Sequence, residues 1–235
     1  MNNWLKYNQL SNFARIISYV FKQKCTLCNT LTNSELSLCE ACIQDLPLAP
    51  NPSCPQCGLS TQGDICGKCL KQPPHFDVTN AFLHYSYPVD ALLQHYKYKN
   101  ALYLCQTLAS LFAKKVEMRE IDVMIAMPLH PNRMKVRGFN QSLELAKIIA
   151  RQHHIALDSV SCKRIKNTPP QASLPFKHRL NNMKGAFACN QSFAGQHVAI
   201  IDDVMTTGSS LNELAKILKK AGARKVSCYV LARAT

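Results

Sequence analysis

Eight of the twelve cysteines lie between residues 25 and 69, where they form four Cys-x-x-Cys pairs. Two residues between thiolates let both sulfurs turn toward one metal ion, and two such pairs complete the tetrahedral shell of sulfurs that structural zinc prefers. The predicted ligands are Cys25, Cys28, Cys39, Cys42, Cys54, Cys57, Cys66 and Cys69. The pattern predicts two structural zinc ions, and no catalytic role for them, since no coordination position stays open for water.

The spacing leaves two ways to pair these cysteines. Pairing in chain order gives one site from the first four and a second from the last four, and the spacing alone does not exclude an interleaved pairing of the first pair with the third. A thioredoxin-like redox motif fits less well, because it needs one Cys-x-x-Cys in a βαβ setting rather than four in tandem. The short Pro-rich segment has too few large apolar side chains to fold alone, so we expect metal to supply its stability.

Residues 198–222 carry a second pattern, in which a strand, two acidic residues, a polar loop and a helix follow one another. Residues 198–201 form a short apolar run, typical of a strand covered on both faces of a parallel sheet. Ser210 and Glu213 have the spacing of a capping box at the start of the helix, and Gly222 is placed to end it. The small residues that lead into the helix are Thr206, Thr207, Gly208, Ser209 and Ser210.

This order of residues suits a ribose 5-phosphate as ligand. A polar loop that runs into a helix N-terminus offers backbone N–H groups, hydroxyl donors and the positive end of the helix dipole to a phosphate. Asp202 and Asp203 are poorly placed against a phosphate but can accept hydrogen bonds from vicinal sugar hydroxyls. P-loop NTPases and dinucleotide-binding folds are disfavoured, because the sequence contains neither G-x-x-x-x-G-K-[ST] nor G-x-G-x-x-G.

The run V-A-I-I-D-D-V-M-T-T-G-S-S closely resembles the signature with which type I phosphoribosyltransferases bind phosphoribosyl pyrophosphate (PRPP). Residues 24–233 as a whole resemble the ComF family, which has the hallmark R-x-R-G-F-N-Q-S. The first Arg of this hallmark is replaced by Lys135 here, which keeps the positive charge but loses the bidentate hydrogen bonding of a guanidinium. The resemblance implies an α/β protein of the type I phosphoribosyltransferase fold, a twisted, mainly parallel sheet flanked by helices, with a small N-terminal zinc-ribbon module. It also implies that PRPP with Mg²⁺ binds the acidic pair, residues 206–210 and Arg137.

A polar, Pro-rich segment follows Arg164, and Pro169, Pro170 and Pro175 exclude a helix there. A long loop of this kind is typical of a functional lid. It resembles the flexible catalytic loop of phosphoribosyltransferases, which would exclude water from a diphosphate and stabilise the leaving-group charge. On this resemblance, the residues predicted to be catalytic are Arg164, Gln171 and Arg179.

These sites require a sheet that brings them together, with ligands at the carboxyl ends of its strands. Strands are predicted near residues 121–127, 159–165, 197–202 and 225–232. Asn140 is placed to cap a helix with an apolar stripe that includes Leu143 and Ile149. The predicted organisation is an amphipathic helix over residues 1–23, a zinc-binding module over 24–75 and a phosphoribosyltransferase-like domain over 76–235.

Charge is uneven along the 235 residues, which include 28 Lys and Arg against 14 Asp and Glu. Residues 131–185 hold eleven basic residues against Glu144 and Asp158. Such a stretch attracts a small phosphorylated ligand and a nucleic-acid backbone alike, and a solvated basic face is the structural alternative. The residues predicted to contact DNA are Arg133, Lys135 and Arg137.

Three functional hypotheses are compatible with these features. The ComF resemblance favours a competence protein that binds PRPP and single-stranded DNA during natural transformation, with a DNA-uptake helicase or other competence proteins as partners. The residue chemistry alone favours an active phosphoribosyltransferase that acts on an unidentified base. The third hypothesis is a zinc-based protein adaptor with a relic PRPP site. With no long apolar run and no secretory signal, the sequence predicts no membrane span and a cytoplasmic location.

Overall fold

The computed structural model describes residues 23–34, 36–98, 101–167 and 183–235. The chain divides into two compact units, Met1–Leu46 and Pro47–Thr235. The second cysteine cluster therefore belongs to the same unit as the sheet, whereas the sequence suggested a division between residues 75 and 76. The predicted N-terminal helix lies outside the described residues, apart from Gln23, which begins a strand.

The described part of the first unit contains little regular structure. Strands β1 (Gln23–Lys24) and β2 (Leu31–Thr32) pair antiparallel, and helix α2 (Glu40–Gln44) follows. Cys25 and Leu38 are fully buried. The described part of this unit buries few apolar side chains, which agrees with the expectation that a metal ion stabilises it.

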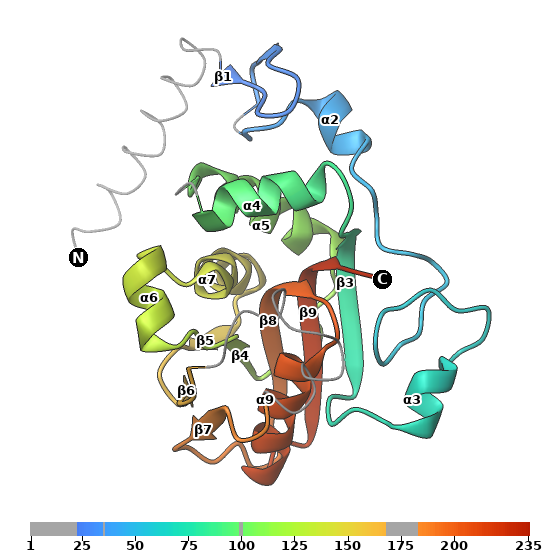
Figure 1. Cartoon of the computed structure of the whole chain (residues 1–235), viewed down its shortest axis with the longest axis vertical. Coiled ribbons are helices and arrows are strands. Elements are labelled where there is room, and N and C mark those ends of the chain that lie inside the picture. Colours follow the sequence, from blue (N-terminus) through green and yellow to red (C-terminus); the bar gives the residue numbers. More distant parts are fainter. Residues whose placement is uncertain (1–22, 35, 99–100, 168–182) are drawn as a thin grey trace. The chain divides into compact units, whose positions relative to one another are not determined.

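The second unit is built on a five-stranded sheet in the order β3-β9-β8-β4-β5 (Figure 1). Its strands are β3 (Val78–His84), β4 (Val123–Ala126), β5 (Ala156–Asp158), β8 (His197–Met205) and β9 (Lys225–Arg233). All four neighbouring pairs are parallel. The central strands β8 and β9 are buried along almost their whole length, as the apolar run in the sequence predicts.

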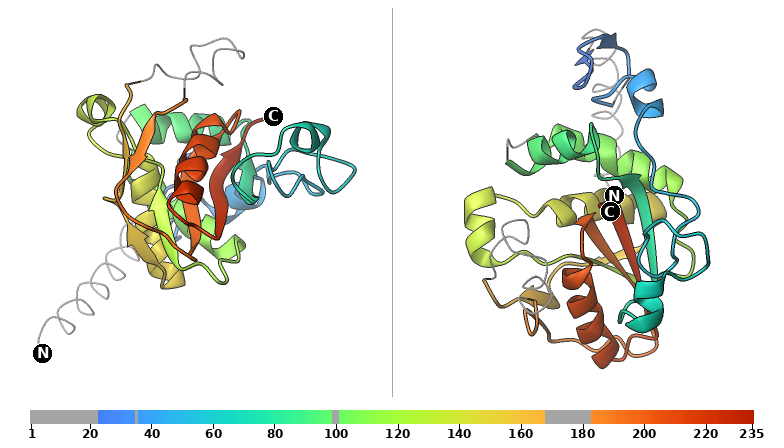
Figure 2. Two further views of the ribbon diagram at one scale, coloured as in Figure 1. Left: turned by 90° about the horizontal axis from the view of Figure 1, so that it is seen from below. Right: turned by 45° about the vertical axis from the view of Figure 1, so that its right-hand side comes forward.

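Helices cover both faces of this sheet, as Figure 2 shows. Helices α4 (Val89–Tyr98), α5 (Tyr103–Lys115) and α7 (Gln141–His153) lie on one side and α9 (Ser209–Lys220) on the other. Alternate residues of the central strands, including Val198, Ile200 and Cys228, form one core with Leu214 and Leu218 of α9. The short helices α3 (Gly67–Lys71) and α6 (Pro131–Arg137) complete the unit.

Two features of the sheet differ from the sequence prediction. The strand predicted near residues 159–165 is not part of the sheet; β6 (Cys162–Arg164) pairs antiparallel with β7 (Phe187–Cys189) in a separate hairpin, and β5 takes the edge position. The strand β3 at the opposite edge was not predicted, because its residues lack a clean apolar pattern. Asn140 caps α7 as predicted, accepting hydrogen bonds from Ser142 N at 3.1 Å and Leu143 N at 3.4 Å.

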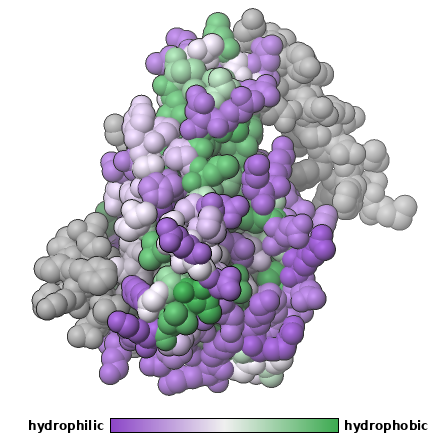
Figure 3. All heavy atoms as spheres, turned by 90° about the vertical axis from the view of Figure 1, so that its right-hand side faces the viewer, coloured by the Kyte–Doolittle hydropathy of each residue, from purple (hydrophilic) through white to green (hydrophobic). Residues whose placement is uncertain are grey.

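The surface shown in Figure 3 is largely hydrophilic, and its hydrophobic residues lie in separate patches. Among the described residues, no helix has both the length and the apolar character needed to cross a membrane.

Candidate functional site

The cysteines form two clusters that pair in chain order. Cys25, Cys28, Cys39 and Cys42 make the first cluster, and Cys54, Cys57, Cys66 and Cys69 make the second. Within each cluster the four Sγ atoms all lie within 4.8 Å of one another. The chain-order pairing, which the spacing left open, is therefore the one found.

The geometry of both clusters fits tetrahedral zinc. A shell with Zn–S bonds of about 2.3 Å has sulfurs about 3.8 Å apart. The Sγ atoms of Cys28 and Cys39 are 3.6 Å apart, and those of Cys57 and Cys66 are 3.5 Å apart. Burial raises the pKa of the Cys54 thiol, but backbone N–H donors outweigh it and lower that pKa to about 7, whereas burial raises the pKa of Cys57 and Cys69 in the same cluster.

The loop after β8 has the backbone geometry that the sequence pattern requires. Gly208 has a φ of +77°, and a Cβ atom there would lie 2.7 Å from Cε of Met205. Glycine at this position lets the chain turn sharply into α9. The hydroxyls of Thr207 and Ser209 are 2.8 Å apart, and Ser209 N donates to Thr207 Oγ1 at 3.3 Å.

The predicted capping box is wrong. Helix α9 begins one residue earlier than Ser210, with Gly208 as its N-cap, so no side chain caps it. Glu213 Oε1 instead accepts a hydrogen bond from Gly185 N at 2.7 Å. The Glu213 carboxylate therefore makes a tertiary hydrogen bond with Gly185 instead of capping the start of α9, as the local sequence pattern predicted. Gly222 follows the end of α9 as predicted.

A cleft of about 490 Å³ opens at the carboxyl ends of β4 and β8. Polar residues that line it include both members of the acidic pair, two loop residues and four basic residues, namely Asp202, Asp203, Thr206, Ser210, Lys97, Arg133, Arg137 and Arg164. Its position agrees with the rule that ligands of parallel sheets bind at the carboxyl ends of the strands.

The acidic pair is held in the cleft by neighbouring elements. Asp202 Oδ1 accepts hydrogen bonds from Ser142 Oγ at 2.8 Å and from Asp203 N at 2.9 Å. Asp203 Oδ2 forms an ion pair with Lys97 Nζ at 2.8 Å. Burial, reinforced by the nearby Asp203, raises the pKa of Asp202 to about 7. Two carboxylates held this close, with hydrogen-bonding capacity left over, suit the binding of hydroxyl groups or a divalent cation.

The guanidinium groups of the cleft, those of Arg133, Arg137 and Arg164, are close enough to affect one another electrostatically. Burial and then repulsion from neighbouring Arg133 lower the pKa of Arg164 to about 10, against the opposing effect of Asp202. Burial and then Arg137 lower the pKa of Arg133. Three guanidinium groups that repel one another in a partly buried site favour an anionic ligand, because its charge would relieve the repulsion.

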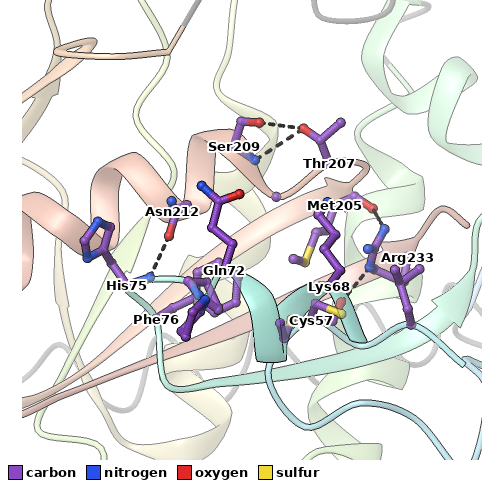
Figure 4. A pocket seen from close by; sticks show the side chains of 15 residues that line it. Cys57, Lys68, Gln72, His75, Phe76, Met205, Thr207, Ser209, Asn212 and Arg233 are labelled. Atoms are coloured by element: carbon purple, nitrogen blue, oxygen red, sulfur yellow. Dashed lines mark hydrogen bonds between the residues drawn. The ribbon is translucent and has the colours of Figure 1, made fainter. Parts of the chain in front are cut away.

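Not every predicted site residue lines this cleft. Thr207, Gly208 and Ser209 line a smaller pocket of about 150 Å³, shown in Figure 4, together with Cys57 and Arg233. Lys135 is exposed on α6 and is not among the residues that line the cleft. Arg133, Lys135 and Arg137 all lie on the short helix α6. Gln171 and Arg179 lie outside the described residues.

Three residues of the cleft were not predicted from the sequence. Lys97 belongs to α4, far from any recognised motif, and only the fold brings its Nζ to Asp203. Tyr98 accepts a hydrogen bond from Arg137 at 3.3 Å, and its ring lies 5.3 Å from the Arg137 guanidinium. Ser142, the last residue of the R-G-F-N-Q-S run, binds Asp202, so that motif was the available signal for it.

Comparison with known proteins places this chain in a family. A competence protein F of Haemophilus influenzae is 34% identical to it over 227 residues, which cover 91% of this chain and 98% of that protein. The chain belongs to the competence protein F family. Within this family, a DNA utilization protein YhgH of Shigella flexneri is 32% identical over 89% of this chain and 89% of its own length. A competence protein ComFC of Streptococcus pneumoniae is 24% identical over 86% of this chain and 90% of its own length.

Two domain models match the regions described above. A double zinc ribbon domain matches residues 16–70, which include both cysteine clusters. A phosphoribosyl transferase domain matches residues 140–235, which include α7, the acidic pair and the loop into α9. Together with the parallel sheet, these matches show the type I phosphoribosyltransferase fold in a family member with an N-terminal double zinc ribbon.

Proposed function

We propose that this protein acts in DNA uptake during natural transformation and binds PRPP with Mg²⁺ in the cleft at the carboxyl ends of β4 and β8. The observation that carries the proposal is the convergence of an acidic pair, two hydroxyl residues of the loop into α9 and several guanidinium groups on one cleft. Relatives named as competence and DNA utilization proteins support the biological role. We place this role in the cytoplasm, beside a DNA-uptake helicase or other competence proteins.

Each part of the cleft would bind a different part of PRPP. Asp202 and Asp203 would accept hydrogen bonds from the ribose hydroxyls, and the loop over residues 206–210 would bind the 5-phosphate. Arg137 and Arg164 would face the diphosphate, whose negative charge matches the guanidinium groups. Mg²⁺, when bound, would neutralise part of the diphosphate charge.

Complementation of a deletion strain tests the role in transformation. A strain without the gene should regain its transformation frequency when it expresses the wild-type protein. Expression of the Asp202→Asn/Asp203→Asn variant should restore little of it, because the site would no longer hold PRPP. Full restoration by this variant, at equal protein level, would show that transformation does not need the cleft and would favour the adaptor hypothesis.

The same cleft supports a second candidate function, an active phosphoribosyltransferase. Arg164 lines the cleft that holds the acidic pair, where a cation could stabilise a departing pyrophosphate. The reaction would displace pyrophosphate from the anomeric carbon of PRPP by a nitrogen of a base. Release of pyrophosphate that depends on an added base, and that falls in Arg164→Ala, would identify this activity.

Single-stranded DNA is the second proposed ligand, bound by Arg133, Lys135 and Arg137. Replacing all three with Ala should weaken DNA binding and make it less dependent on salt, because each phosphate contact contributes about 0.7 to the slope of log K against log salt. Fluorescence anisotropy with a labelled oligonucleotide measures both quantities. A matched control, Lys114→Ala/Lys115→Ala/Arg151→Ala, removes the same charge from exposed positions that do not line the cleft. Equal losses in both variants would mean that only net charge matters.

A further inference from the structure

Arg233, at the end of β9, joins the second cysteine cluster to the loop after β8. Its side chain is 3% exposed. Nε donates to the backbone oxygen of Cys57 at 2.7 Å. Nη1 donates to the backbone oxygens of Met205 at 3.0 Å and Thr206 at 2.5 Å, and also to that of Ala234. Figure 4 shows the guanidinium between Cys57 and Met205, so one buried cation contacts both a metal ligand and the residues that begin the loop.

The second cluster is also fixed to the edge of the sheet. Thr79 of β3 donates from its backbone N to Pro55 O at 2.8 Å and from Oγ1 to Gln56 O at 2.5 Å. Gly58 has a φ of +69°, and a Cβ atom there would lie 3.3 Å from Cγ2 of Thr79. The turn that carries Cys54 and Cys57 therefore packs directly on β3, and the position of Cys57 O relative to Arg233 is set by several independent contacts.

Metal in this cluster would change the charge next to Arg233. A buried guanidinium is costly unless negative charge lies nearby. Four thiolates with one Zn²⁺ carry a net charge of −2, whereas four protonated thiols carry none. Cys57, Cys69 and Arg233 line the same small pocket, together with loop residues Thr207 and Gly208. A metal-loaded cluster would therefore supply a counter-charge to Arg233 beside the loop.

We propose that zinc in the second cysteine cluster holds the phosphate-binding loop in its binding conformation through Arg233, so that PRPP binding requires this ion but not the ion of the first cluster. The inference rests on the proposed PRPP site. Arg233 is a positioning residue here, because it acts on the ligand through the backbone of Met205 and Thr206.

The two clusters provide a matched pair of variants. Cys39 and Cys66 are equivalent positions: each is partly buried and each is the N-cap of a five-residue helix, α2 or α3. Cys39→Ser and Cys66→Ser should each lose one zinc ion, as measured by metal analysis. By calorimetry, PRPP with Mg²⁺ should bind Cys39→Ser within about twofold of wild type and Cys66→Ser at least about tenfold more weakly. Equal affinities in the two variants would overturn the proposal.

The variant Arg233→Gln tests the contribution of the arginine while both metal sites stay intact. This variant should keep both zinc ions, lose at least about tenfold in PRPP affinity and show faster hydrogen exchange at the amides of residues 206–210. Arg233→Lys, which keeps the charge, should recover part of the loss. If Cys66→Ser does not fold, Arg233→Gln decides the question: a folded variant with wild-type affinity and wild-type exchange rates refutes the link.

Hydrogen exchange also separates this inference from the proposed function. It is measured on the protein without ligand, so it reports on the loop even if the wild-type protein does not bind PRPP. Absence of PRPP binding to wild type together with faster loop exchange in Cys66→Ser would refute the PRPP site alone. Normal PRPP binding with unchanged loop exchange in Cys66→Ser would refute the zinc link alone.

Discussion

PRPP with Mg²⁺ is expected to raise the melting temperature of the wild-type protein, and the substitution Asp202→Asn/Asp203→Asn is expected to abolish this rise. At a free ligand concentration of 100 times Kd, binding adds about 2.7 kcal/mol to the free energy of unfolding, which corresponds to about 5–10 °C for a chain of this size. The amides keep the shape of the carboxylates but remove two negative charges that would bind hydroxyls and attract Mg²⁺. Differential scanning fluorimetry with and without ligand measures the shift.

A matched acidic position tests whether the loss is specific. Asp158 lies at the carboxyl end of β5 and does not line the cleft, whereas Asp202 and Asp203 do line it. Asp158→Asn should therefore keep the full PRPP-induced shift, even if the free protein becomes less stable. A shift that persists in the double variant would rule out the assigned site.

The stability of the ligand-free protein should also depend on pH because of Asp202, and this tests the environment of Asp202 without PRPP. Burial raises the pKa of Asp202 to about 7 in the folded state, above its unfolded value. Ionisation of Asp202 therefore lowers the free energy of unfolding. This loss of stability is complete above about pH 7 and disappears toward pH 4. Asp202→Asn alone should be more stable than wild type at pH 8, by on the order of 2 kcal/mol, with a smaller difference at pH 5. The single variant is the cleaner one, because Asp203→Asn would break the ion pair with Lys97.

Removal of zinc is expected to unfold the first unit. Structural zinc contributes about 10–16 kcal/mol of binding free energy, which is as large as the whole stability of a typical domain. The described part of this unit has two short strands, one five-residue helix and little apolar interior to replace that contribution. After treatment with a strong chelator, limited proteolysis should cut rapidly within residues 24–46.

A substitution of one ligand should reproduce the effect of the chelator. Cys42→Ser should make residues 24–46 sensitive to protease without chelator, while Cys105→Ser should leave them resistant. Cys105 is a buried thiol of α5 outside both clusters, and burial raises its pKa to about 11. Continued resistance after complete loss of zinc would show that apolar contacts alone hold the unit together.

The chemical sites were predictable wherever the information is local in sequence. The Cys-x-x-Cys spacing predicted the metal ligands, and the order of strand, acidic pair, loop and helix predicted where Asp202 and Asp203 would lie. The pairing of the cysteines was not predictable, because chain-order and interleaved arrangements satisfy the same spacing. The structure resolves it by bringing each set of four sulfurs together.

Features that depend on distant residues were not predictable. Lys97 reaches Asp203 only because α4 packs beside the carboxyl ends of the strands, and nothing near Lys97 in the sequence signals that contact. Strand β3 was missed since an edge strand is only partly buried and its sequence V-T-N-A-F-L-H does not alternate cleanly. Glu213 fits a capping box locally, but the backbone of Gly185 competes successfully for its carboxylate.

The order of strands has a consequence for how the protein is made. Strand β9 lies between β3 and β8 although it is later in the chain than both, and Val226 of β9 bonds to Asp77, 149 residues earlier. Until β9 has been made, β3 has no neighbouring strand in the sheet and β8 is open along one side, and unpaired strand edges favour aggregation. Arg233 emerges from the ribosome after Cys57, Met205 and Thr206, so its contacts with the loop after β8 can form only once β9 has been made.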